Sequence, residues 1–262
     1  MTVPLWIVPG LAAVAAAALA YGWFEAGWLR RRVLELEVDG LPAELAGLRI
    51  AQLSDFHFGP VSRGRAAGLR AAAWVRDRRP DLVVVTGDLL SRPRGRCDLD
   101  EALRGLDAYA VLGNHDVAVT RDPFSRAAEL DGLAATLLVG DSRLVRLRGV
   151  DVQVAGTEPY LAAAAPAPDE AAAFRILLSH YPRLRAPGYQ LVLAGHMHAG
   201  QIVLPYPGGR VRFAHLRAPL NQGVYRREGV TLHVSPGLGT TFVPFRFFAR
   251  PEVTELVLRS RP

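Results

Sequence analysis

The chain has 262 residues, half of them apolar, so it is long enough to bury a full core, and its composition excludes a disordered protein. Its net charge of +6 is compatible with a nucleic acid, an anionic membrane surface or a phosphorylated substrate as partner. All basic residues are arginines, which codon bias alone can produce, and none form the aromatic-interleaved tract of a nucleic-acid groove. A single cysteine, Cys97, excludes an internal disulfide and a thiolate metal cluster, so any metal site must use histidine and oxygen ligands.

The segment from Val3 to Phe24 contains no charged side chain. As a helix rising about 1.5 Å per residue it would measure roughly 33 Å, enough to cross a bilayer core. Aromatic residues lie near both ends, and Arg30, Arg31 and Arg32 follow it. Residues 1–32 are therefore predicted to be a single-pass anchor with a basic flank, which keeps residues 33–262 in the cytoplasm. A buried alanine-rich helix and a cleaved signal are the alternatives.

Residues 33–262 are predicted to be one domain. An edge strand within 33–47 leads to buried strands at 48–55, 82–88 and 108–116, with helices at about 65–79, 99–106 and 123–135. The second half predicts strands at 143–147, 150–156, 174–180, 190–196, 230–237 and 253–259, and a surface loop at 159–173. This order predicts an α/β fold, a four-layer αββα sandwich of two mixed β-sheets flanked by helices.

The most apolar predicted strands all end in polar residues of the metal-ligating kind. Because parallel strands end at one edge of a sheet, these side chains are expected to converge. Imidazole with oxygen donors suits Zn, Mn, Fe or similar ions, and seven ligands suit two ions that share a carboxylate. In an extended backbone His196 and His198 would point the same way, towards two ions about 3.5 to 4 Å apart. The polar residues at the ends of these predicted strands are Asp55, His57, Asp88, Asn114, His115, Asp116, His180, His196 and His198.

These motifs resemble the signature of the calcineurin-like metallophosphoesterase superfamily, DxH, GD, GNH[DE], H and GHxH. The C-terminal part, with SPGLGTT and RFFARPEVTELVL, is similar to its bacterial, membrane-associated YkuE/YaeI-like branch. The resemblance implies two divalent ions with Asp88 bridging them, one ion held by Asp55, His57 and His198 and the other by Asn114, His180 and His196. Here the signature stands as Asp55-Phe56-His57, Gly87-Asp88, Gly113-Asn114-His115-Asp116, His180 and Gly195-His196-Met197-His198.

The resemblance further implies hydrolysis of a phosphodiester or pyrophosphate by in-line attack of a hydroxide that bridges the ions. His115 would face the substrate, stabilising the phosphoryl group or protonating the leaving oxygen. Arg92 matches a position where some relatives place an arginine on phosphate; a solvated loop arginine is the alternative. In several branches the GD motif continues as GDxxD and its second Asp orients the histidine of GNH. Ser91 stands there in this chain, so Asp116, the backbone or solvent is expected to take that part.

The anchor favours a lipid-linked substrate, and relatives that cleave the pyrophosphate of acylated UDP-sugars imply one candidate. A catalytically silent metal-bound scaffold and a nucleic-acid or nucleotide phosphodiesterase are the alternatives. The complete ligand set disfavours the first and the missing basic tract disfavours the second, so no nucleic acid is expected. His215 and His233 are predicted to be structural and Cys97 inert, while residues 243–251 are predicted to be a core strand edge or a membrane-facing rim.

Overall fold

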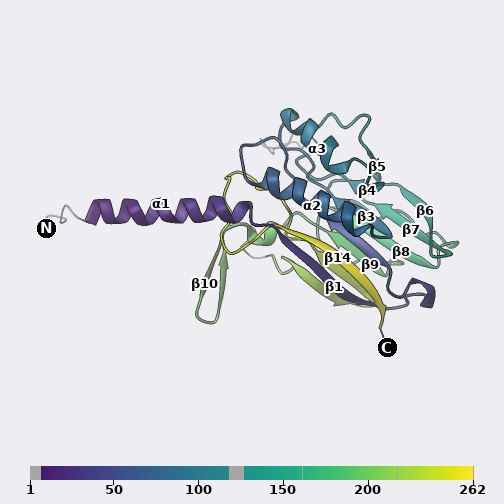
Figure 1. Cartoon of the computed structure of the whole chain (residues 1–262). Helices are drawn as coiled ribbons and strands as arrows, with labels where there is room; N and C mark the ends of the chain where they lie inside the picture. The colour runs from purple at the N-terminus through teal and green to yellow at the C-terminus, as the bar shows by residue number, and fades with distance from the viewer. Residues whose placement is uncertain (1–6, 118–126, 161, 217, 262) are drawn as a thin grey trace.

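The computed structural model describes residues 7–117, 127–160, 162–216 and 218–261, which contain two six-stranded β-sheets packed face to face (Figure 1). Strands β2 to β5 of the first sheet are parallel, whereas β14 is antiparallel to β2 and parallel to β1. The spatial order is β1 (Arg30–Val38), β14 (Glu252–Ser260), β2 (Arg49–Leu53), β3 (Leu82–Thr86), β4 (Ala108–Val111) and β5 (Ala135–Leu137).

The second sheet is also mixed, since β7, β8, β9 and β13 are parallel while the edge strands β6 and β12 run antiparallel to their neighbours. Its spatial order is β12 (Gly223–Arg227), β13 (Val230–Val234), β9 (Leu191–Ala194), β8 (Phe174–Ser179), β7 (Val150–Gly156) and β6 (Ser142–Leu147). A separate two-stranded sheet consists of β10 (Val203–Tyr206) and β11 (Gly209–Arg212). Short 3-10 turns occur at Ala43–Leu45, Pro93–Gly95 and His198–Gly200.

The main core lies between the two large sheets. Because side chains alternate along a strand, Phe174, Ile176 and Leu178 of β8 enter this core, while Leu177 belongs to a cluster on the outer face of the second sheet. In the same way Ile50 of β2 faces the second sheet, whereas Ala51 and Leu53 belong to the cluster on the outer face of the first sheet. All five residues of β3 are buried, as expected of a strand covered on both faces.

Helices α2 (Gly64–Arg78) and α3 (Arg96–Leu103) cover the outer face of the first sheet. Small residues of α2, Ala67, Gly68 and Ala71, are buried and let this helix approach the sheet closely. The predicted α/β class with two sheets and helices is confirmed. Among the described residues, however, the outer face of the second sheet is covered by irregular segments that contribute Leu184 and Leu220, rather than by a layer of helices.

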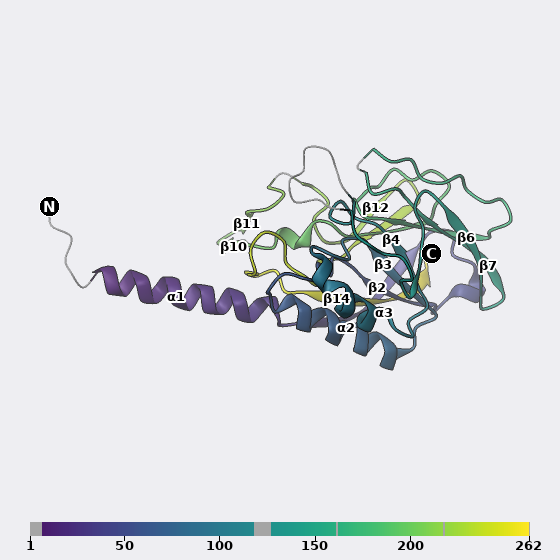
Figure 2. The same ribbon diagram turned by 90° about the horizontal axis from the view of Figure 1, so that it is seen from above.

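Helix α1 (Ile7–Ala26) projects away from the sheets as a long apolar rod (Figures 1 and 2). Its residues Val8–Ala26 are long and apolar enough to cross a membrane and are only 11% buried, which confirms the predicted apolar helix and excludes a buried core helix. Strand β1 begins at Arg30, so the three arginines predicted to flank the anchor already lie in the edge strand. Arg30 and Arg32 form ion pairs with Glu252 of the neighbouring β14.

Sequence and structure differ most between residues 118 and 137. Of the helix predicted at 123–135, residues 123–126 lie outside the described part, residues 127–134 are irregular, and Ala135 begins β5; the prediction was wrong over the described part. Strand β5 is favoured instead because Ala135–Leu137 pair with Ala108–Ala110 of β4 and extend the sheet. The strands β10, β11 and β12 were not predicted.

Candidate metal centre

The predicted site residues lie in loops that follow the carboxyl ends of β2, β3, β4, β8 and β9. Because these strands belong to both large sheets, the loops meet where the two sheet edges lie together. The side-chain amide of Gln52 in β2 fixes this edge by donating to the carbonyl of Ala194 in β9, at 2.9 Å, and to Thr86 Oγ1, at 3.2 Å. The predicted convergence is therefore present in the structure.

Four predicted ligands, Asp55, His57, Asp88 and His198, form one buried cluster in which each offers a ligand atom within 4.8 Å of the others. The Nε2 atoms of His57 and His198 are 3.0 Å apart. Nε2 of His198 lies 3.5 Å from Asp55 Oδ1, and Nε2 of His57 lies 3.2 Å from Asp88 Oδ2. Four donor atoms thus face one point in space.

A second cluster joins Asp88 to His180 and His196. The same Oδ2 of Asp88 lies 3.3 Å from Nε2 of His180. That nitrogen is 3.1 Å from Nδ1 of His196 and 3.1 Å from Oδ1 of Asn114. One carboxylate oxygen therefore faces both clusters, and the seven residues divide into the same two sets that the sequence motifs implied.

The spacing of the donor atoms fits divalent metal ions. With metal–ligand bonds of about 2.1 Å, neighbouring ligands are separated by roughly 3.0 Å in octahedral and roughly 3.4 Å in tetrahedral geometry. The observed separations run from 3.0 to 3.5 Å. Nitrogen lone pairs this close repel one another unless a cation or a proton lies between them. The cluster therefore indicates divalent metal binding.

Most of these residues occupy strained backbone. Asp55, His57, Asp88, His196 and His198 have positive φ angles between 46° and 72°, a region that residues other than glycine rarely adopt. Strand β9 ends at Ala194, so the extended arrangement predicted for His196 and His198 is wrong. An irregular segment, in which the two histidines have positive φ angles and Met197 between them is in the right-handed α region, directs the two imidazoles.

Glycines allow the loops to approach the centre. A Cβ on Gly195 would overlap Ser54 Oγ and would lie 2.5 Å from Asp55 Oδ2, and one on Gly113 would overlap the Asp88 carboxylate. Gly200 has a φ of +87°, and a Cβ on it would meet the side chain of Arg212 rather than a candidate ligand.

Hydrogen bonds behind the cluster orient the imidazoles. A carbonyl only accepts, so Nδ1 of His180 donates to Thr86 O at 2.9 Å, and this bond turns Nε2 towards the cluster. Nδ1 of His57 lies 2.7 Å from Ser91 Oγ. Ser91 is thus placed to orient His57, not the histidine of GNH that the resemblance assigns to an aspartate at this position in several branches.

Asp116 joins two loops through backbone amides. Its carboxylate accepts hydrogen bonds from the amides of Leu89 at 2.9 Å, Leu90 at 3.0 Å and Gly113 at 2.9 Å. These bonds connect the loop that carries Asp88 to the loop that carries Asn114.

Burial and neighbouring charges shift the pKa values of several residues in the cluster. Burial alone would raise the pKa of Asp88, but the imidazoles of His180 and His57 hold that pKa well below its usual range. Burial opposes the charged form of His180, yet Asp88 beside it raises the pKa of His180 to about 9. Burial raises the pKa of Asp55 and, together with His180, lowers that of His196 to about 2.

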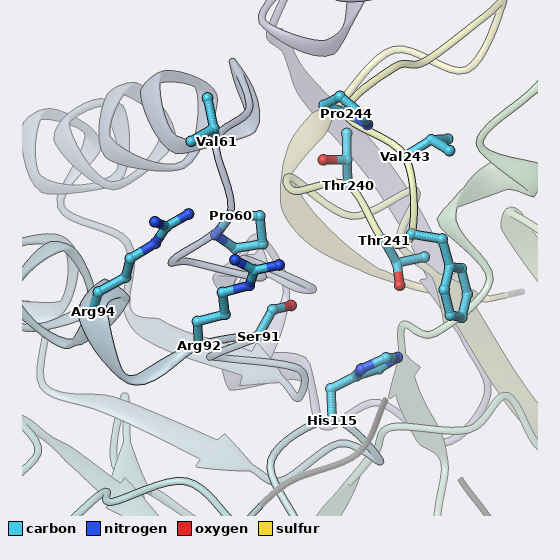
Figure 3. Close-up of a pocket in the computed structure, with 11 residues that line it drawn as sticks. Pro60, Val61, Ser91, Arg92, Arg94, His115, Thr240, Thr241, Val243 and Pro244 are labelled. Atoms are coloured by element: carbon cyan, nitrogen blue, oxygen red, sulfur yellow. The ribbon is translucent and has the colours of Figure 1, made fainter. Parts of the chain in front are cut away.

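A pocket of about 410 Å³ opens beside the cluster (Figure 3). Ser91, Arg92, Arg94 and His115 line one wall, and the backbone amide of His115 donates to Asp88 Oδ1 at 2.9 Å. Thr240 and Thr241 lie on the facing wall with Val243 and Pro244. Arg92 and His115, both predicted to contact substrate, therefore share one pocket next to the candidate ligands.

The remaining histidines, the cysteine and one buried arginine differ in how they relate to the cluster. His233 is fully buried and its Nδ1 bonds Gln52 Oε1 at 2.7 Å, consistent with the predicted structural role. His215, also expected to be structural, is exposed, with its ring 4.9 Å from that of His196. Cys97 is exposed on α3. Arg246 was not predicted to lie at the site. It is fully buried, and its guanidinium donates to Nδ1 of His198 at 3.2 Å.

Comparison with known proteins agrees with this geometry. Residues 48–200 match the family described as Calcineurin-like phosphoesterase. A transmembrane protein with metallophosphoesterase domain from Danio rerio is 31% identical over 95% of this chain, which spans 62% of that relative's length. Metallophosphoesterase YkuE of Bacillus subtilis is 28% identical over 95% of this chain and 94% of its own length. Phosphodiesterase YaeI of Escherichia coli is 27% identical over 90% of this chain and 89% of its own length. The chain therefore belongs to the calcineurin-like phosphoesterase family.

Proposed function

We propose that the protein is a membrane-anchored phosphoesterase with two divalent metal ions, which hydrolyses a phosphodiester or pyrophosphate bond of a lipid-linked substrate. The observation that carries the proposal is the shared carboxylate: Asp88 Oδ2 lies 3.2 Å from Nε2 of His57 and 3.3 Å from Nε2 of His180, between two sets of ligands. In this proposal residues 1–32 are the single-pass anchor and residues 33–262 the catalytic domain on the cytoplasmic side.

The proposed roles follow from where each side chain lies. Asp55, His57 and His198 hold one ion, Asn114, His180 and His196 hold the other, and Asp88 binds both. When bound, Mn, Zn, Fe or similar ions would polarise the phosphate and make a water nucleophilic near neutral pH. His115, in the pocket wall, donates a proton to the leaving oxygen or a hydrogen bond to the phosphoryl group. Arg92 binds a phosphate oxygen through its guanidinium.

The pocket lining has both cationic and apolar side chains, which supports an amphiphilic substrate. Arg92 and Arg94 line it together with the apolar side chains of Val61, Phe242 and Val243. Segments on both sides of this apolar part contact the end of α1. Arg63 lies over the ring of Phe24, and the ring of Phe245 is 6.5 Å from that of Trp23. A lipid chain could therefore pass from the pocket to the bilayer while its phosphate stays at the metal cluster. The name of YaeI, a phosphodiesterase, supports a diester.

Replacing Asp88 by Asn tests the central proposal. We expect bound metal to fall below two ions per chain and activity to fall more than about 100-fold, because losing even an outer contact of a metal site commonly costs 10- to 100-fold. Metal analysis and assays of the full chain in vesicles, on an aryl phosphodiester and on a phospholipid, give both readouts. The exposed residue Asp107 provides the matched control Asp107→Asn. Full activity of Asp88→Asn would refute the metal mechanism. If the unsubstituted chain hydrolysed the aryl ester but not the phospholipid, the proposed lipid substrate would be refuted.

Replacing Gly195 by Ala tests the close approach of the loop. The new methyl group displaces Ser54 and Asp55, so we expect metal affinity to fall about 10- to 100-fold while the fold persists. Calorimetric metal titration and circular dichroism measure the two effects. A methyl group on Gly10 in α1 meets no atom within 4 Å, which makes Gly10→Ala the steric control. Unchanged metal affinity in Gly195→Ala would contradict the geometry.

His115→Ala tests proton donation to the leaving group. The substitution keeps the backbone amide that bonds Asp88 and removes only the imidazole. We expect kcat to fall about 100-fold or more for an alkyl phosphodiester, whose leaving oxygen needs a proton, and much less for a nitrophenyl ester. Equal losses for both esters would show that His115 does not donate this proton.

Reporter fusions test the topology. Arg30, Arg31 and Arg32 lie within one short segment of the end of α1 at Ala26, so the positive-inside rule predicts a cytoplasmic signal from a reporter placed after residue 262. A reporter placed before residue 1 should give the opposite signal if α1 crosses the membrane once. An extracytoplasmic signal at the C-terminus would reverse the proposed orientation.

A further inference from the structure

The hairpin formed by β10 and β11 has one apolar face. The pairing of Leu204 with Val211 places these two side chains on the same face, and Tyr206 lies two residues further along β10 on that face. Phe213 follows the last residue of β11, and its amide donates to Ile202 O at 2.9 Å, which continues the pairing and places Phe213 on the side of Val211. The four side chains are 47%, 44%, 54% and 58% exposed in that order. The hairpin therefore presents a continuous row of large apolar groups to its surroundings.

This apolar face points away from the domain. Val203 and Arg212, the next cross-strand pair, lie on the other face: Val203 is buried against Ala199 and Ala249, and the side chain of Arg212 lies against Gly200. A two-stranded sheet on its own is only marginally stable in water, and this one offers its apolar side to solvent. The physical chemistry thus calls for an apolar partner outside the described residues.

The position of the hairpin indicates which partner. Val203 N donates to Phe247 O at 2.9 Å, and the ring of Phe247 lies 5.9 Å from the ring of Tyr21 in α1. Figures 1 and 2, seen from directions 90° apart, both show the hairpin projecting from the domain on the side from which α1 leaves it. A bilayer crossed by α1 would lie on this side. The hairpin is thus continuous with the membrane-facing end of the anchor.

Charge favours the same partner. Residues 201–216 include Arg210 and Arg212 and contain no aspartate or glutamate. Arg210 is exposed and lies on the face opposite Leu204 and Val211. An element with apolar side chains on one face and arginine on the other suits the boundary between lipid headgroups and acyl chains, especially when the lipids are anionic.

We propose that the β10–β11 hairpin is a second membrane contact, which inserts Leu204, Tyr206, Val211 and Phe213 into the headgroup boundary of the bilayer that α1 crosses. Arg210 then contacts lipid phosphates. The chain continues from Phe213 to His215, whose ring is 4.9 Å from that of His196. Insertion of the hairpin would consequently hold this edge of the metal centre at the lipid surface.

Site-directed fluorescence tests the contact in the full chain. In a Cys97→Ser background, Leu204→Cys and Val211→Cys carry an environment-sensitive label, and Leu144→Cys in β6 is the control. Leu144 is 48% exposed, close to the 47% of Leu204, but lies on an edge strand far from α1 (Figure 1). In vesicles of phosphatidylcholine and phosphatidylglycerol we expect labels at 204 and 211 to shift to the blue, to be quenched by brominated acyl chains and to escape aqueous iodide. The label at 144 should show the reverse.

Equal quenching by iodide at positions 204 and 144 would overturn the proposal. A blue shift that grows with protein density in the vesicles and ignores lipid bromination would also overturn it, because a second copy of the chain would then cover the hairpin. Circular dichroism of each labelled chain checks that it is folded. As an independent readout, Arg210→Glu should reduce quenching at position 204 in anionic vesicles more than in neutral ones, and an equal response would remove the role of lipid phosphates.

Discussion

The buried carboxylate of Asp88 is the interaction on which the arrangement of the molecule depends. It contacts His57 from the first sheet, His180 from the second and the backbone amide of His115. An isolated carboxylate away from water is very costly, so this one is tolerable only with compensating groups around it. Those groups come from the loops after β2, β4 and β8, which belong to both large sheets. The same requirement gathers the metal ligands, because imidazoles that surround a carboxylate at 3.2–3.3 Å are also placed to share cations with it.

The centre is built from locally unfavourable pieces that the rest of the fold holds in place. Left-handed backbone at residues such as Asp88 and His198 costs on the order of 1–3 kcal/mol each. Asp116 restrains the loops after β3 and β4 through three backbone amides, and Gln52 links the two sheets directly below the cluster. Beneath these bonds the apolar core between the sheets fixes the strand ends. Strain of this kind keeps ligand atoms close together before a metal arrives, so less ordering remains to oppose binding.

Much of the fold and the ligand set could be predicted because apolar runs that end in Asp or His are visible in a sequence. What depends on backbone amides or on tertiary pairing has no such signature. Asp116 and Ser91 have partners that only the fold brings near them, and Arg246 lies in a segment that looked like a strand edge or membrane rim. The alanine- and leucine-rich stretch before residue 135 suits a helix, yet pairing with β4 makes Ala135 begin a strand. The hairpin was missed because Pro205 and Pro207 resemble loop residues and its apolar face enters no core.

The end of α1 and the metal centre are joined by one buried network. The carboxylate of Glu25 accepts the amides of Phe248 and Ala249 at 2.9 and 2.6 Å, and Gly22 O accepts the amide of Arg246 at 3.1 Å. The guanidinium of Arg246 then donates to carbonyls at 236, 239 and 249 and to Nδ1 of His198. A buried cation is tolerated when its donors are satisfied in this way, and breaking one partner is costly. A flexible tether would need none of these bonds. Their presence means that α1 is connected to His198 through buried hydrogen bonds, so in the proposed membrane orientation the helix would set how His198 lies relative to the bilayer.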